Sequence, residues 1–155
     1  MTPAALGPAA PLLAVADTGV LLAAFNARDV LHKAGVEALN VPRILLISPL
    51  VLAELDHLLH TRAGERAAVD AVTRIGALAG QGRVQIATVD RPLLAEAEEL
   101  MRRHLGVRLG LADCVNAALA WRLTRPALLT FDKHYSTVLA PRRPGEKRLE
   151  VHPGP

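Results

Sequence analysis

The chain has 155 residues, half of which are hydrophobic, and a formal net charge of +3. This length predicts one domain with a substantial apolar core, and the single cysteine, Cys114, excludes an internal disulfide and fits a reducing cytosol. No apolar run reaches the roughly 18 residues that a membrane-spanning helix needs, so the sequence predicts a cytoplasmic protein without a membrane partner. The small basic excess is compatible with nucleic-acid binding but is not evidence for it.

The chain begins with a segment that predicts no regular structure. Residues 1–11 contain three prolines and one glycine and are expected to form a flexible arm. Because this segment lacks a basic start and the prolines interrupt any apolar helix, it does not fit a signal peptide. The folded domain is therefore expected over residues 12–152.

Strands and helices are predicted to alternate along this domain. Short apolar runs typical of strands buried on both faces lie at 12–16, 43–47, 84–87 and 127–129, and a last edge strand is expected at 148–151. Apolar spacing and capping signals predict helices at 20–25, 29–39, 49–61, 65–79, 90–104, 111–123 and 135–139. This order requires crossover connections, so we expect a three-layer α/β/α fold with a mostly parallel sheet of about five strands.

Four acidic residues are placed where such a fold brings side chains together. Asp17 and Asp132 each follow a buried strand, Glu54 lies early in the helix after the second strand, and Asp113 lies in the first turn of the helix from Leu111. All four elements start or end at the carboxyl edge of a parallel sheet, where ligands bind in open α/β folds. Because clustered carboxylates repel one another, the pattern predicts a site for a hard divalent cation, Mg²⁺ or Mn²⁺.

Each acid also has an ordinary structural explanation. Asp17 fits a helix cap, Asp113 is favoured by the helix dipole, Asp132 fits a turn, and Glu54 fits an exposed helix face. The shared edge makes the set more informative than any one member. Thr18, Asn116 and Thr130 lie beside the acids in sequence and are expected to support them, as caps or as hydrogen-bond partners.

Other metal chemistries do not fit the sequence. Glu54, His57 and His60 have the spacing of half of a di-iron helix motif, but no second Glu-x-x-His is present. The histidines and the lone cysteine lack the spacing of a zinc site. There is also no nucleophile elbow or phosphate-binding glycine loop.

With these motifs the sequence resembles the PIN-domain ribonucleases, and in particular the VapC-type toxins of bacterial toxin–antitoxin pairs. Four segments, each containing one of the acids, carry the resemblance: 16–22, 48–55, 109–120 and 129–135. His32 also matches a histidine that is frequent in the family's second helix, whereas the amide Asn116 stands where the family often has a further acid.

The resemblance implies Mg²⁺- or Mn²⁺-dependent cleavage of RNA, with Asp17, Glu54, Asp113 and Asp132 as catalytic and metal-binding residues. It also implies an RNA substrate, a cognate antitoxin and a homodimer. In the resulting hypothesis Asp17, Glu54 and Asp113 hold one metal ion and Asp132 completes the site.

Two further parts of the interpretation stay open at this stage. Basic side chains near the site edge are candidates for contacts with the RNA backbone: Arg28, Lys33, Arg108, Lys133 and His134. A receiver-like Mg²⁺-binding signalling domain and a catalytically silent interaction protein are the alternatives to a nuclease.

Overall fold

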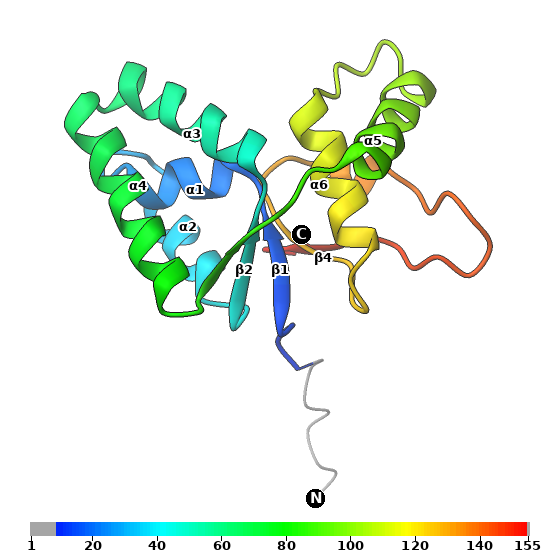
Figure 1. Ribbon diagram of the computed structural model, residues 1–155, viewed down its shortest axis with the longest axis horizontal. Coiled ribbons are helices and arrows are strands. Elements are labelled where there is room, and N and C mark those ends of the chain that lie inside the picture. The colour runs from blue at the N-terminus through cyan, green and yellow to red at the C-terminus, as the bar shows by residue number, and fades with distance from the viewer. Residues whose placement is uncertain (1–8, 155) are drawn as a thin grey trace, which may run out of the picture.

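The computed structural model of the protein describes residues 9–154, and most of the predicted arm, residues 1–8, lies outside the described residues (Figure 1). Its centre is a sheet of five strands in the order β3-β2-β1-β4-β5, in which every neighbouring pair is parallel. The strands are β1 (Leu13–Ala16), β2 (Ile44–Ile47), β3 (Val84–Ile86), β4 (Ala127–Leu129) and β5 (Glu150–His152). The predicted α/β class and the parallel sheet are confirmed.

Helices cover both faces of this sheet. One face carries α1 (Thr18–Phe25), α2 (His32–Leu39), α3 (Pro49–Arg62) and α4 (Glu65–Gly80). The other carries α5 (Arg91–Arg103), α6 (Leu111–Trp121) and the short α7 (His134–Thr137). Figure 1 shows the two groups on opposite sides of the strands. No helix among residues 9–154 is long and apolar enough to span a membrane.

Each central strand contributes side chains to two cores. In β1, Ala14 and Ala16 pack with the helices α1 to α4, whereas Val15 packs with α5 and α6. Successive strand residues point to opposite faces, so a strand covered on both sides needs apolar residues at every position. This requirement explains the continuous apolar runs of β1, β2 and β4.

The order of the strands creates a crevice at one place in the sheet. The strands β1, β2 and β3 lie side by side in chain order, and the helices that connect β1 to β2 and β2 to β3 cover one face of the sheet. The chain then crosses to the other side of β1, where β4 pairs with it, and the helices α5 and α6 of this crossover cover the other face. The connections that leave β1 and β4 therefore diverge at their carboxyl ends. In open parallel sheets this divergence is where ligands bind.

Several element boundaries differ from those predicted. The second helix begins at His32 and not at Asp29, because the Asp29 carboxylate accepts a hydrogen bond from the Leu31 backbone N–H and closes a turn there. Asn26 is the C-cap residue of α1, and its side-chain oxygen accepts a hydrogen bond from the Arg28 backbone N–H. The last strand begins at Glu150 instead of 148, and α6 ends at Trp121 instead of 123.

The helices α1 and α2 touch closely at one glycine. A Cβ atom on Gly35 would lie 2.9 Å from the Ala24 nitrogen and 3.0 Å from the Val20 oxygen, both of which belong to α1. His32 joins the same two helices, since its Nδ1 lies 2.9 Å from the Ala23 carbonyl oxygen and donates to it. The position of α1, which follows directly from Asp17, thus depends on the absence of a side chain at residue 35.

We expect Gly35→Ala to lower the free energy of unfolding by about 1–3 kcal/mol, because the new methyl group pushes α2 away from the α1 backbone. Gly76→Ala is the matched control: Gly76 lies in α4, and among the described residues nothing beyond the neighbouring backbone of its own helix lies within 4 Å of an added Cβ, so a gain of about 0.5–1 kcal/mol is expected. Urea denaturation of both variants measures the effects. Equal shifts in the same direction would contradict the close contact.

Candidate active site

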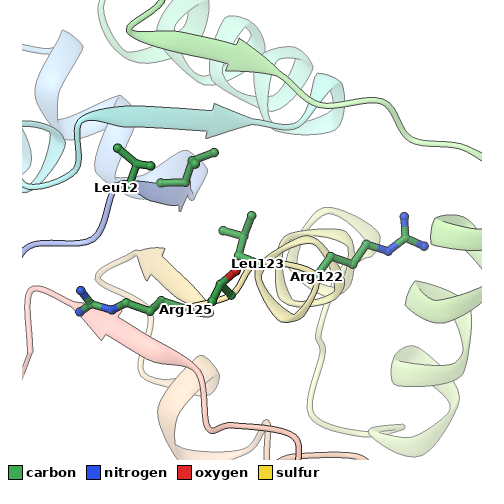
Figure 2. A pocket seen from close by; sticks show the side chains of 6 residues that line it. Leu12, Arg122, Leu123 and Arg125 are labelled. Carbon is green, nitrogen blue, oxygen red and sulfur yellow. The ribbon is translucent and has the colours of Figure 1, made fainter.

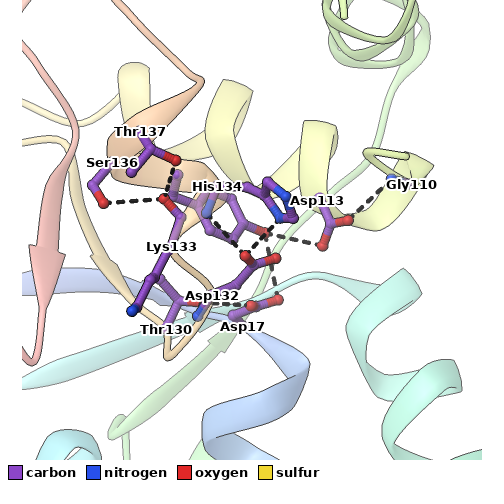
Figure 3. Close-up of polar contacts among 10 residues, drawn as sticks. Asp17, Gly110, Asp113, Thr130, Asp132, Lys133, His134, Ser136 and Thr137 are labelled. Carbon is purple, nitrogen blue, oxygen red and sulfur yellow. Dashed lines mark hydrogen bonds and ion pairs between the residues drawn. The ribbon is translucent and has the colours of Figure 1, made fainter. Parts of the chain in front are cut away.

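Asp17 is the most buried of the four site acids, with 7% of the residue's surface exposed. It lies between β1 and α1, and its backbone N–H donates to the Leu129 carbonyl oxygen of β4 at 2.9 Å. Its Oδ1 accepts from the Thr18 backbone N–H at 2.9 Å and from Asn116 Nδ2 at 3.1 Å. Its Oδ2 accepts from Thr130 Oγ1 at 2.7 Å (Figure 3). Asp17 therefore caps α1 and also faces the crevice beside β4.

Tyr135 links this carboxylate to a second one. Its hydroxyl oxygen lies 3.4 Å from Oδ1 of Asp17 and 3.2 Å from Oδ1 of Asp113, and it accepts from Asn116 Nδ2 at 3.3 Å. The side chain is fully buried. Tyr135 was not among the site residues predicted from the sequence. A usable signal was present, because this is the only tyrosine of the chain and it follows Asp132 by three residues.

Asp113 and Glu54 face each other from two helices on opposite sides of the sheet. Asp113 lies in the first turn of α6, where its Oδ2 accepts from the Gly110 backbone N–H at 3.0 Å. Glu54 lies on α3 with an exposed side chain. Both line a cavity of about 580 Å³, called here the Glu54 cleft. Its lining residues are Pro49, Leu50, Ala53, Glu54, Gly110, Leu111, Ala112 and Asp113.

Asp132 follows β4 and is joined to Asp17 through one hydroxyl group. Thr130 Oγ1 donates to Asp17 and accepts from the Asp132 backbone N–H at 2.9 Å. The Asp132 carboxylate accepts from the backbone N–H of His134 at 2.9 Å and lies 2.8 Å from its Nδ1 (Figure 3). His134, a candidate for an RNA-backbone contact in the sequence, thus holds a site carboxylate in this structure.

The environment of the site raises the pKa values of Asp17, Glu54 and Tyr135. Burial raises the pKa of Asp17 to about 6, the hydrogen bond from Thr130 opposes this rise, and the negative charges of Asp113 and Asp132 add to it. The pKa of Glu54 is raised by burial and by the charge of Asp113. The pKa of Tyr135 is raised strongly by burial and by Asp17 and Asp113. The tyrosine therefore stays a neutral donor between two carboxylates.

The donor chemistry of this cluster fits a hard divalent cation, although no metal cage is preformed. Within residues 9–154 no three His, Cys, Asp or Glu side chains are grouped closely enough to hold a metal ion as they stand. Mg²⁺ usually keeps several waters and takes only one or two carboxylates directly, so such a cage is not required. The buried Oδ1 of Asn116 has no hydrogen-bond partner among the described residues 9–154, which leaves one more oxygen acceptor beside Asp17.

The remaining residues predicted for the site are Thr18 and four basic residues, and in the described part of the chain their side chains form no hydrogen bond or ion pair with the four acids. The side chain of Thr18 is buried, and its backbone N–H is the group that contacts Asp17. The other four basic candidates are exposed, and their contact with RNA stays a prediction: Arg28, Lys33, Arg108 and Lys133.

A cavity at the opposite end of the sheet has a different character. It measures about 330 Å³ and lies where β1 and β4 begin (Figure 2). Its lining residues are Leu12, Leu13, Arg122, Leu123, Thr124 and Arg125, and these include no carboxylate. The lining of this cavity therefore offers no carboxylate that could bind a metal ion.

Comparisons with known proteins agree with this geometry. The model of the PIN domain family matches residues 14–139. Ribonuclease VapC26 of Mycobacterium tuberculosis is 35% identical over 128 residues, which are 82% of this chain and 92% of that protein. The crystal structure of VapC20 from the same organism, described as a sarcin–ricin loop cleaving toxin, matches with a TM-score of 0.70 and 26% identity over 80% of this chain and 92% of its own.

A more distant solved structure shares the fold. VapBC2 from Rickettsia felis, bound to a DNA fragment from its promoter, matches with a TM-score of 0.59 and 18% identity. The match covers 90% of this chain and 96% of the other.

We expect Asp17→Asn to stabilise the metal-free protein at neutral pH. The pKa of Asp17 lies above its ordinary value of 3.8, at about 6, so the contribution of this carboxyl group to stability is fully present below pH 3.8 and is lost as the pH rises to about 6. A neutral amide avoids this loss, which is at most about 3 kcal/mol. Urea unfolding in EDTA should show a gain of about 1–3 kcal/mol at pH 7.5 that disappears near pH 4.

An exposed carboxylate provides the control for this measurement. Asp70 lies on the outer side of α4, and Asp70→Asn should change the free energy of unfolding by less than about 0.5 kcal/mol. A destabilised Asp17→Asn protein at pH 7.5 would contradict the view that the carboxylate is a buried, unfavourable charge.

Proposed function

The chain belongs to the PIN domain family, and from this premise we propose that it is a metal-dependent endoribonuclease that acts as the toxin of a bacterial toxin–antitoxin pair. The observation that carries the proposal is the buried carboxylate of Asp17, joined through Tyr135 to Asp113 and through Thr130 to Asp132 at the crevice between β1 and β4. The similarity to Ribonuclease VapC26 over most of both chains supports it.

The metal of this proposal is Mg²⁺ or Mn²⁺. Asp17 and Asp113 are its first ligands, because one tyrosine hydroxyl lies within hydrogen-bond distance of both carboxylates. Glu54 and Asp132 complete the acidic surface on either side. A bound divalent cation lowers the pKa of a water molecule and stabilises the charge on the phosphate that is attacked.

The protein's own groups hold these acids in place. Thr130, Asn116 and the Thr18 backbone N–H fix the carboxylate of Asp17. His134 and the Thr130 hydroxyl fix the loop that carries Asp132. Because the carboxylates of Asp17, Asp113 and Asp132 are oriented before substrate arrives, little reorganisation is needed when the negative phosphate approaches.

The partners follow from the same family assignment. The substrate is RNA, and a stem–loop with the sarcin–ricin sequence is the first RNA to test, because VapC20 is described as cleaving that loop. A cognate antitoxin is expected to bind the protein and suppress cleavage. A homodimer is expected as well, and its mass in solution tests this directly.

The receiver-like alternative does not fit the order of the strands. Receiver-type folds place the third strand next to the first, whereas here β3 lies at the edge beside β2. Asp90, which follows β3, accepts from the Leu93 backbone N–H and caps α5. A catalytically silent PIN-like protein would keep the fold and cleave no RNA, so activity distinguishes it from the nuclease.

We expect Asp17→Asn and Glu54→Gln to reduce RNA cleavage at least about a hundredfold, because each removes a charge from the acidic cluster that positions the metal ion. The assay follows a labelled stem–loop RNA with Mg²⁺, with Mn²⁺ and with EDTA, and EDTA should abolish cleavage. Asp70→Asn, on the outer side of α4, should cleave as the wild type does.

The same proteins test the biological part of the proposal. Expression of the wild type should arrest bacterial growth, co-expression of the gene adjacent to it should restore growth, and Asp17→Asn should not arrest growth. Metal-dependent cleavage that survives Asp17→Asn would refute the assigned site.

We also expect Tyr135 to act as a positioning residue. Tyr135→Phe keeps the ring in its buried place but removes the hydroxyl that holds Asp17 and Asp113. A hydrogen bond to a charged group contributes about 1.5–3 kcal/mol, so Mn²⁺ binding, measured by electron paramagnetic resonance, should weaken about tenfold. The melting temperature in EDTA serves as the control for folding. Unchanged Mn²⁺ affinity in a folded variant would contradict this role.

A further inference from the structure

A second hollow borders the acidic cluster, on the side of β4 and β5. It measures about 490 Å³ and is called here the Lys133 pocket. Its lining residues are Thr130, Phe131, Asp132, Lys133, Ser136, Thr137, Val151, Pro153 and Gly154. It shares no lining residue with the Glu54 cleft, so the acids are bordered by two separate hollows.

The two hollows differ in charge. The Glu54 cleft is lined by two carboxylates and by no lysine or arginine. The Lys133 pocket contains one carboxylate, Asp132, and one ammonium group. Asp132 is already engaged by His134, whereas Lys133 forms no ion pair among residues 9–154. A polyanion that crosses the cluster is therefore favoured on the side of Lys133.

The backbone of this pocket is held firmly. The hydroxyls of Ser136 and Thr137 both donate to the Lys133 carbonyl oxygen, at 3.1 and 2.8 Å (Figure 3). These bonds fix the turn from which the lysine side chain extends, while that side chain stays exposed. The backbone of Lys133 is therefore fixed, while its ammonium group is exposed and free to contact a phosphate.

The pocket also contains an aromatic ring. Phe131 is half-buried: it packs against the core on the α1 side and also lines the pocket. The chain has only two phenylalanines, one tyrosine and one tryptophan; Tyr135 is fully buried among the acids, whereas Phe131 lines the pocket beside them. Aromatic side chains bind unpaired bases by stacking, with little regard to sequence.

We propose that the Lys133 pocket is a nucleotide subsite, which holds the base and ribose next to the cleaved phosphate, with Phe131 against the base and Lys133 at the neighbouring phosphate. The inference rests on the proposed ribonuclease function and extends it to a defined part of the substrate. Its size suits a nucleoside, since ligand pockets measure about 300–1,000 Å³. Val151, Pro153 and Gly154 form one wall and lie beyond residue 139, where the match to the PIN family model ends.

Two variants and a matched control test the subsite. Phe131→Leu keeps apolar volume but cannot stack, and Lys133→Met removes the charge. Lys147→Met removes the same charge near Thr124, which precedes β4 at the opposite end of the sheet. Phe131→Leu should raise KM for RNA about tenfold with kcat nearly unchanged. Lys133→Met should reduce the slope of log affinity against log salt by about 0.7. Lys147→Met should do neither.

An altered substrate identifies the contact with the base. An RNA with an abasic ribose on one side of the mapped cleavage position should bind the wild type about tenfold more weakly, and Phe131→Leu should add no further loss with that RNA. Additive losses would overturn the stacking contact. Salt slopes that are equal for Lys133→Met and Lys147→Met would overturn the phosphate contact.

RNA binding in EDTA separates this inference from the proposed function. Wild-type protein that cleaves no RNA, but binds a short single-stranded RNA through Lys133 and Phe131, refutes the ribonuclease function and keeps the subsite. Protein that cleaves RNA with all three variants equal to wild type keeps the function and refutes the subsite.

Discussion

The burial of one carboxylate is the constraint on which the arrangement depends. Asp17 is nearly inaccessible to solvent, and an isolated charge at such a place is strongly unfavourable. Four elements supply the donors that offset this penalty: the start of α1, the middle of α6, the end of β4 and α7, which carries Tyr135. Each of these must be positioned to within hydrogen-bond distance. The carboxylate therefore ties together parts of the chain that lie about a hundred residues apart.

The topology makes this meeting possible. After β3, at one edge of the sheet, the chain crosses back and places β4 on the other side of β1, parallel to it. Thr130, which follows β4, therefore lies close to Asp17, which follows β1. The helix α6 belongs to the opposite face, and its first two turns present Asp113 and Asn116 on one side, three residues apart. The two helical groups have separate cores on the two faces of the sheet. At the carboxyl edge their polar side chains come together around Tyr135.

The sequence predicted those parts of the molecule that follow from local patterns. Continuous apolar runs identified the buried strands, and the position of each acid relative to its strand or helix placed Asp17, Glu54, Asp113 and Asp132 at one edge. The order of the strands was not predictable, because it depends on which face each crossover covers. The start of α2 was missed since the Asp29 side chain competes with the helix for backbone hydrogen bonds. The role of His134 beside Asp132 was missed although the two residues lie only two positions apart, because its side chain was expected to contact RNA and not a neighbouring carboxylate.

The hydroxyl of Thr130 restricts which residues are acceptable at that position. Its proton is directed to Asp17, and its lone pair receives the Asp132 backbone N–H. Valine has the same shape but offers neither function, and asparagine is too long to serve both partners from one atom. Only serine and threonine provide a donor and an acceptor on a single atom at this distance from the backbone. The spacing between the two strand-end carboxylates is thus encoded in the choice of one small polar residue, and substitutions there would propagate to both acids at once.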